Sequence, residues 1–151
     1  MKKLFVTSIL CAVFFALLSH QAARAQQPKR ADKVKSTHTL RGSFVEFEMG
    51  DYLHAEFRKS TGKRVSFFVG GNESLRYFLA AHRGRRIYFT YQVVEKFIPE
   101  AGGVETIERV VAATFGSEND TRWWRRIRRS GNSEKLRVRY EELVERATKN
   151  N

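Results

Sequence analysis

Apolar and polar residues alternate along five stretches of this chain, and this period of two predicts five β-strands. The first two stretches, residues 40–49 and 52–59, flank Gly50-Asp51, which is a hairpin signal. The third covers residues 64–69, the fourth begins at Arg86 and stops before Pro99, and the fifth covers residues 104–115. The inward positions predicted for the first four strands are, in order, Val45, Phe47 and Met49; Leu53, Ala55 and Phe57; Val65, Phe67 and Val69; and Ile87, Phe89, Tyr91 and Val93.

A helical period replaces the alternation at three places. Leu75, Phe78 and Leu79 form one stripe between the third and fourth strands, with Asn72 as the predicted N-cap. After Gly116, Asp120 is positioned to cap a helix over residues 121–129, and Ser133 is positioned to cap a second one. The stripe of this last helix consists of Leu136, Tyr140, Leu143, Val144 and Ala147.

The order of three strands, one helix and two strands resembles the OB-fold, a five-stranded, partly open Greek-key barrel. The resemblance covers Leu40 to Phe115 and concerns the layout of strands and helix. It implies a mainly β fold with α: a five-stranded OB-like β-barrel domain over residues 39–116, with its helix between strands three and four. Residues 117–151 then form a basic C-terminal helical tail. A small α+β sheet covered by one helix is the alternative.

The N-terminus has the pattern of a signal peptide over residues 1–25. Lys2 and Lys3 precede an apolar run of 15 residues, and Ala23-Arg24-Ala25 has the small residues that signal peptidase requires. The run is shorter than the roughly 20 residues of a membrane span. We therefore expect an exported protein, periplasmic or extracellular, with no transmembrane span after cleavage. Cys11 is the only cysteine, so the mature chain would have no disulfide, thiol nucleophile or cysteine-bound metal.

The positive charge is concentrated at the two ends of the chain. Loss of Lys2, Lys3 and Arg24 with the leader would lower the net charge from +12 to +9. Residues 26–38 carry +3 and lack apolar periodicity, which predicts a basic flexible arm. Residues 121–151 carry +6, whereas residues 39–120 have 11 basic and 11 acidic side chains. We therefore expect charge-driven binding to involve the basic ends of the chain, because the region between them has no net charge.

The sequence shows no set of residues typical of catalysis or metal binding. His54 and His82 match no zinc-binding spacing, and no nucleophile lies beside a base, so we expect no cofactor, metal or catalytic residue. His82 is placed to interact with a helix C-terminus. A small secreted hydrolase or nuclease on an OB-like barrel remains the alternative, and Asp51, Glu56 and Arg58 are the residues that it would use.

Two groups of residues are predicted to bind ligands. The first is the outward face of strands two and three, which in OB-folds holds oligonucleotides or oligosaccharides, and it consists of Tyr52, His54, Arg58, Arg64 and Phe68. Arg64 is expected to be solvated there, so its replacement should cost less than about 0.5 kcal/mol. The second group lies in the first tail helix and consists of Trp123, Trp124, Arg125, Arg126, Arg128 and Arg129. There Trp124 and Ile127 share the face expected to dock the tail, with the arginines on the outer side.

This charge distribution favours a non-enzymatic binding or interaction protein whose basic ends contact an anionic partner. Arginines bind the negatively charged groups that are present in envelope lipid, polysaccharide, nucleic acid and the acidic surfaces of a protein partner. Export argues against nucleic acid among these.

Overall fold

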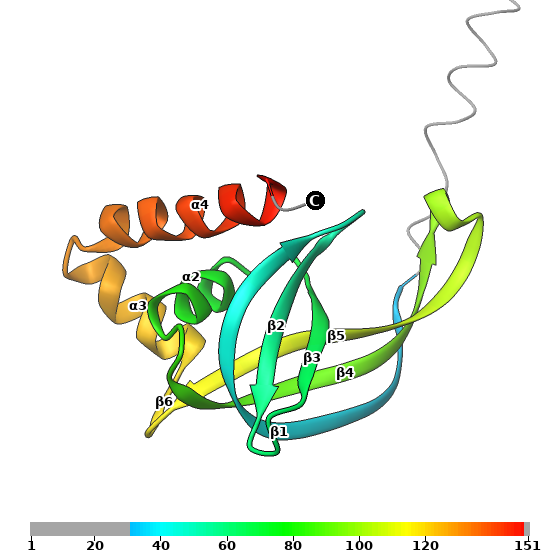
Figure 1. Ribbon diagram of the computed structural model, residues 1–151, viewed down its shortest axis with the longest axis horizontal. Helices are drawn as coiled ribbons and strands as arrows, with labels where there is room; N and C mark the ends of the chain where they lie inside the picture. Colours follow the sequence, from blue (N-terminus) through cyan, green and yellow to red (C-terminus); the bar gives the residue numbers. More distant parts are fainter. Residues whose placement is uncertain (1–30, 150–151) are drawn as a thin grey trace, which may run out of the picture. The chain divides into compact units, whose positions relative to one another are not determined.

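The computed structural model describes residues 31–149, which form six strands and three α-helices (Figure 1). The elements are, in order, β1 (Lys33–Met49), β2 (Leu53–Lys59), β3 (Arg64–Val69), α2 (Glu73–Ala81), β4 (Arg86–Ile98), the 3-10 turn η2 (Pro99–Ala101), β5 (Gly103–Phe115), β6 (Glu118–Asn119), α3 (Asp120–Arg129) and α4 (Ser133–Lys149). None of the helices in this part of the chain is long and apolar enough to cross a membrane.

Five of the strands form a ring, and the sixth extends the sheet. The order is β3-β2-β1-β4-β5-β6, with antiparallel neighbours throughout. A short parallel pairing between β3 and β5 closes the ring, and it joins Phe68 to Arg109 and Val69 to Val110. The helix α2 lies between β3 and β4, as predicted, and two helices follow the last strand. The mainly β fold with α that the sequence predicted is confirmed.

The first strand is longer than the sequence indicated. We expected it to begin at Leu40, after a flexible arm over residues 26–38, but β1 begins at Lys33. Residues 33–43 pair with β4 from Glu95 to Arg86, so backbone hydrogen bonds order a segment that has no apolar periodicity. The expected leader, residues 1–25, and the first part of the expected arm, residues 26–30, lie outside the described residues.

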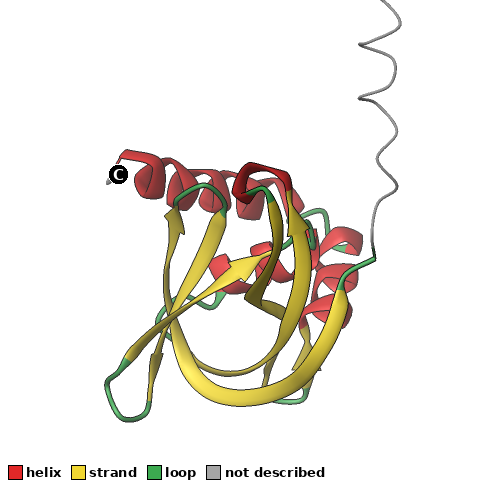
Figure 2. Cartoon of the chain, turned by 90° about the vertical axis from the view of Figure 1, so that its right-hand side faces the viewer, coloured by secondary structure: helices red, strands yellow, loops and turns green. Residues whose placement is uncertain are grey.

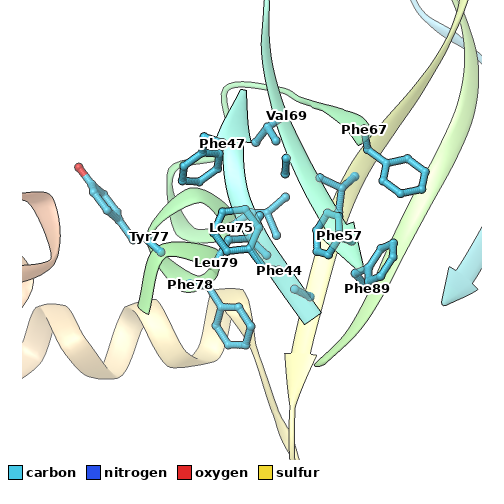
Figure 3. Close-up of a cluster of buried hydrophobic side chains, with 14 of the residues drawn as sticks. Phe44, Phe47, Phe57, Phe67, Val69, Leu75, Tyr77, Phe78, Leu79 and Phe89 are labelled. Atoms are coloured by element: carbon cyan, nitrogen blue, oxygen red, sulfur yellow. The ribbon is translucent and has the colours of Figure 1, made fainter. Parts of the chain in front are cut away.

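Aromatic rings from neighbouring strands meet inside the ring of strands (Figure 3). Phe57 stacks on Phe89 with ring centroids 4.0 Å apart, and Phe67 meets both of them edge-on. The stripe of α2 enters the same cluster, and Leu75, Phe78 and Leu79 have no exposed surface. The inward positions predicted for β2 and α2 are therefore confirmed, as are Phe67 and Val69 in β3 and Ile87 and Phe89 in β4. Val65 and Tyr91 are only partly buried, and Val94 is buried where Val93 was expected.

A β-bulge changes the inward set of β1. Val45 was expected to point inward, but Phe44 and Phe47 are the buried pair, and the register with β2 shifts between Phe44 and Glu46. The loop after α2 binds the bulge: Arg83 Nε donates to the Val45 carbonyl at 2.6 Å, and the Gly84 amide donates to the Phe44 carbonyl at 2.8 Å. Strict alternation fails here because a bulge places two residues of one strand opposite one of the other.

The helices pack at one end of the strands, with α4 contacting both α2 and β1 (Figures 1 and 2). Leu143 and Ala147 of α4 are buried, and the rest of its predicted stripe packs against the same core. Asn119, rather than the expected Asp120, caps α3 by accepting from the Arg122 amide at 2.8 Å. Asp120 is buried instead, and it accepts from the Ala113 amide and from Ser74 Oγ. Side chains of α3 and α4 therefore pack into the same hydrophobic core as the strands.

Candidate functional site

Three of the five residues predicted on the face of β2 and β3 surround one pocket. Its volume is about 270 Å³, and Tyr52, His54 and Phe68 form one side of it. The sequence did not point to the other lining residues, which are Ser66 of β3, Lys96 and Ile98 of β4, and Ile107 and Glu108 of β5. Arg58 and Arg64 lie opposite each other at the far end of the two strands and do not line it.

Phe68 is the centre of this aromatic pocket. Tyr52 and His54 meet its ring edge-on, with centroid distances of 5.6 and 6.2 Å. The Lys96 ammonium lies over the same ring, 4.7 Å from its centroid, and 5.8 Å from the centroid of Tyr52. The Tyr52 hydroxyl donates to Glu100 Oε2 at 2.8 Å, and this hydrogen bond raises the pKa of Tyr52. The pKa of Glu100 is lowered mainly by a hydrogen bond from its own backbone amide and then by Tyr52. The hydrogen bond between Tyr52 and Glu100 also fixes the η2 turn beside the turn between β1 and β2.

Arg64 holds a buried carboxylate in place. Glu56 is only 4% exposed although it is on the outward face of β2, and the Arg64 Nη1 atom lies 3.0 Å from its Oε1 and 3.1 Å from its Oε2. Only the contact with Oε2 has hydrogen-bond geometry. Arg64 is also 3.8 Å from Glu46, so its guanidinium is paired with carboxylates although the side chain is 53% exposed on the outward face.

The two tryptophans of α3 have different environments. Trp123 is 6% exposed, and its ring meets Phe78 and His82 at centroid distances of 5.4 and 5.6 Å. Trp124 is half-buried and stacks on Tyr77 at 4.6 Å. Trp123 is therefore the more deeply buried of the two, while Trp124 and Ile127, the pair that the sequence indicated, also pack against the core. With only 6% of its surface exposed, Trp123 has little surface with which to contact a ligand.

The arginines of α3 form an exposed surface beside Trp124. Arg126 makes a bidentate ion pair with Glu118, and this pairing lowers the pKa of Glu118 and raises that of Arg126. The other four arginines, Arg122, Arg125, Arg128 and Arg129, are exposed and form no ion pair within residues 31–149. We call these four the α3 arginine surface. A hollow of about 430 Å³ is lined by Thr121, Trp124, Arg125, Arg128 and Arg129.

The residues of the alternative hydrolase or nuclease are not gathered into a site. The partner of Glu56 is Arg64, while Asp51 and Arg58 are exposed. Within residues 31–149, no group of three or more His, Cys, Asp or Glu side chains is arranged to hold a metal ion. His82 lies at the end of α2, where a charged imidazole would interact favourably with the helix C-terminus. Burial lowers the pKa of His82, which disfavours that charged form.

Comparison with known protein families, with curated proteins and with solved structures finds no match to this chain. The aromatic pocket and the α3 arginine surface are therefore interpreted from their own chemistry.

Proposed function

We propose that this is an exported, non-enzymatic binding protein whose α3 arginine surface engages a polyanion. The observation that carries the proposal is the contrast within one helix. Arg126 is neutralised by Glu118, whereas the other four arginines project into solvent without an acidic partner in the described part of the chain. Unpaired guanidinium groups bind phosphate, sulfate or carboxylate groups in bidentate geometry.

The packing of α3 supports this role. Trp123 and Ile127 hold the helix against the core, so its arginines are presented on an ordered backbone. Ordered donors lose less conformational entropy on binding than donors of a mobile tail. The leader pattern of residues 1–25 supports export, and export favours anionic envelope lipid or polysaccharide over nucleic acid as the natural partner.

Salt dependence tests the proposal directly. The protein is purified from cells that express the full-length chain, and mass spectrometry is expected to find Gln26 at its N-terminus. Binding to a short DNA duplex, used as a polyanion of known charge spacing, is then measured at several salt concentrations. Four phosphate contacts predict a log–log slope of about −3 to −4. Replacement of Arg122, Arg125, Arg128 and Arg129 together by Gln should remove most of that slope.

A matched variant distinguishes binding through the α3 arginine surface from binding that depends only on the net positive charge. Arg58, Lys63, Arg85 and Arg86 are also exposed and form no ion pair within residues 31–149, so their change to Gln removes the same charge elsewhere. This control should keep the slope of the parent. If both variants lose the slope equally, binding follows net charge and the proposal fails. Heparin and vesicles with anionic or neutral lipid then rank the classes of partner.

A further inference from the structure

The aromatic pocket lies where two strands of the ring separate. β3 and β5 pair only through Phe68–Val69 and Arg109–Val110. Before this contact the two strands diverge, and Ser66 of β3 and Ile107 and Glu108 of β5 line the pocket between them. The hydrogen bond from Tyr52 to Glu100 holds the far end of the hairpin of β4 and β5 beside the pocket. The space is therefore bounded by ordered strands.

Lys96 gives the pocket one positive charge in a mainly apolar lining. Its ammonium is stabilised by the faces of Phe68 and Tyr52, and it forms no ion pair within the described residues. An aromatic ring attracts a cation but accepts no strong hydrogen bond, so the ammonium retains donors for an added acceptor. Ile98 and Ile107 add aliphatic surface to the lining.

We infer that this pocket binds a small monocarboxylate with a planar, apolar body. The body lies against Phe68, Ile98 and Ile107, and the carboxylate pairs with Lys96. A volume of about 270 Å³ lies at the lower limit of ligand pockets, which hold roughly 300–1,000 Å³, so one ring is accommodated. Glu108 is exposed at the rim, and its charge disfavours a ligand with a second negative group.

The site is separate from the α3 arginine surface and does not rest on the function proposed for that surface. None of its lining residues belongs to α3 or α4. Failure of one proposal therefore leaves the other standing.

The test is an NMR titration of the ¹⁵N-labelled protein with four probes. Benzoate has both the ring and the carboxylate, benzyl alcohol has the ring alone, acetate has the charge alone, and glucuronate is an acidic sugar. Benzoate should shift the amide signals of Ser66, Phe68, Lys96 and Ile107, and it should bind about tenfold more tightly than benzyl alcohol because it gains one charge-assisted hydrogen bond. Acetate should bind more weakly than benzoate by a similar factor, because it lacks the apolar contact.

Two variants with unchanged fold make the assignment specific. Lys96→Gln should weaken benzoate about tenfold and leave benzyl alcohol unchanged, because it removes only the charge. Lys63→Gln removes an exposed lysine outside the pocket and should change neither affinity. The amide spectra of both variants show whether the fold is retained.

Three results would overturn the inference. The first is equal affinity for benzoate and benzyl alcohol, which would mean that Lys96 contributes nothing. The second is benzoate shifts confined to α3, which would place the anion on the arginine surface. The third is tighter binding of glucuronate than of benzoate, which would assign the pocket to carbohydrate.

Discussion

Arg64 and Glu56 form an ion pair on the outward face of the ring, and the two side chains differ in their exposure to solvent. The Glu56 side chain is 6% exposed, whereas that of Arg64 is 53% exposed. A carboxylate removed from water in this way requires a partner, because an unpaired buried charge is costly. Arg83 approaches Glu46 at 3.8 Å, so the pair belongs to a larger group of charges that links β1, β2 and β3 to the loop after α2.

We predict that Arg64→Ala lowers the free energy of unfolding by about 1–3 kcal/mol, because Glu56 remains buried without its partner. Urea unfolding of the variant measures this change. The control is Arg58→Ala, at the position directly opposite in the strand pair, which should cost less than about 0.5 kcal/mol. The double variant Arg64→Ala and Glu56→Gln should recover part of the loss. Equal costs for Arg58→Ala and Arg64→Ala would show that the ion pair contributes no stability.

At the scale of elements, α3 is held in place by one side chain above the others. Trp123 packs edge-on against Phe78 and His82, near the C-terminal end of α2, while Trp124 covers Tyr77 at the margin of the core. Asp120 adds a polar link, since its carboxylate accepts from the Ser74 hydroxyl of α2 at 2.8 Å. The helix that presents the arginines is therefore attached to α2 as well as to β5.

Trp123→Ala is expected to lower the free energy of unfolding by about 3–5 kcal/mol, as for other large aromatic residues removed from a core. Trp124→Ala should cost less, about 1–2 kcal/mol, because the side chain is only partly buried at the margin of the core. Chemical denaturation of the two variants gives both values. The opposite ranking would mean that Trp124 docks α3, as its spacing from Ile127 suggested.

Residue spacing predicted the elements better than their ends or their irregularities. Alternation in β2 and β3 and the stripe of α2 depend on local period, which a sequence displays directly. The bulge at Val45 depends on donors from Arg83 and Gly84, which are almost 40 residues away along the chain. Asn119 and Asp120 are equally good N-cap residues, and only the buried acceptor site beside Ala113 selects between them.

The candidate site was predicted in part for the same reason. Tyr52, His54 and Phe68 share a face through alternation and strand pairing, which the sequence indicated. Lys96 and Ile107 reach that face only because the hairpin of β4 and β5 turns toward β2, and no local pattern encodes this path. The sequence likewise does not show which arginine of α3 is paired, because the tertiary fold determines that Arg126 meets Glu118.

At the scale of the molecule, the strands and the helices of the tail meet around His82. Its ring stacks on Phe78 at 4.1 Å and also contacts Phe115 of β5 and Trp123 of α3. His82 Nδ1 lies 2.8 Å from the Phe78 carbonyl. Burial lowers the pKa of His82 most, Arg85 and Arg126 lower it further, and the Phe78 carbonyl and Glu118 oppose the shift. A change in the charge of this one imidazole therefore acts on contacts among α2, β5 and α3.

We predict that the whole fold loses stability as the pH falls from 7 to 5. The unfolded chain takes up a proton at His82 near the ordinary pKa of about 6.5, whereas the folded chain takes it up only at a lower pH. The unfolded state then binds more protons, so the free energy of unfolding is highest above pH 7, decreases below about pH 6.5 and levels off once the folded-state pKa is passed. Urea unfolding at several pH values measures this slope, and His82→Gln should flatten it. His38→Gln, which removes an exposed imidazole from β1, is the control and should keep the slope of the parent. An unchanged slope in His82→Gln would assign the pH dependence to other groups.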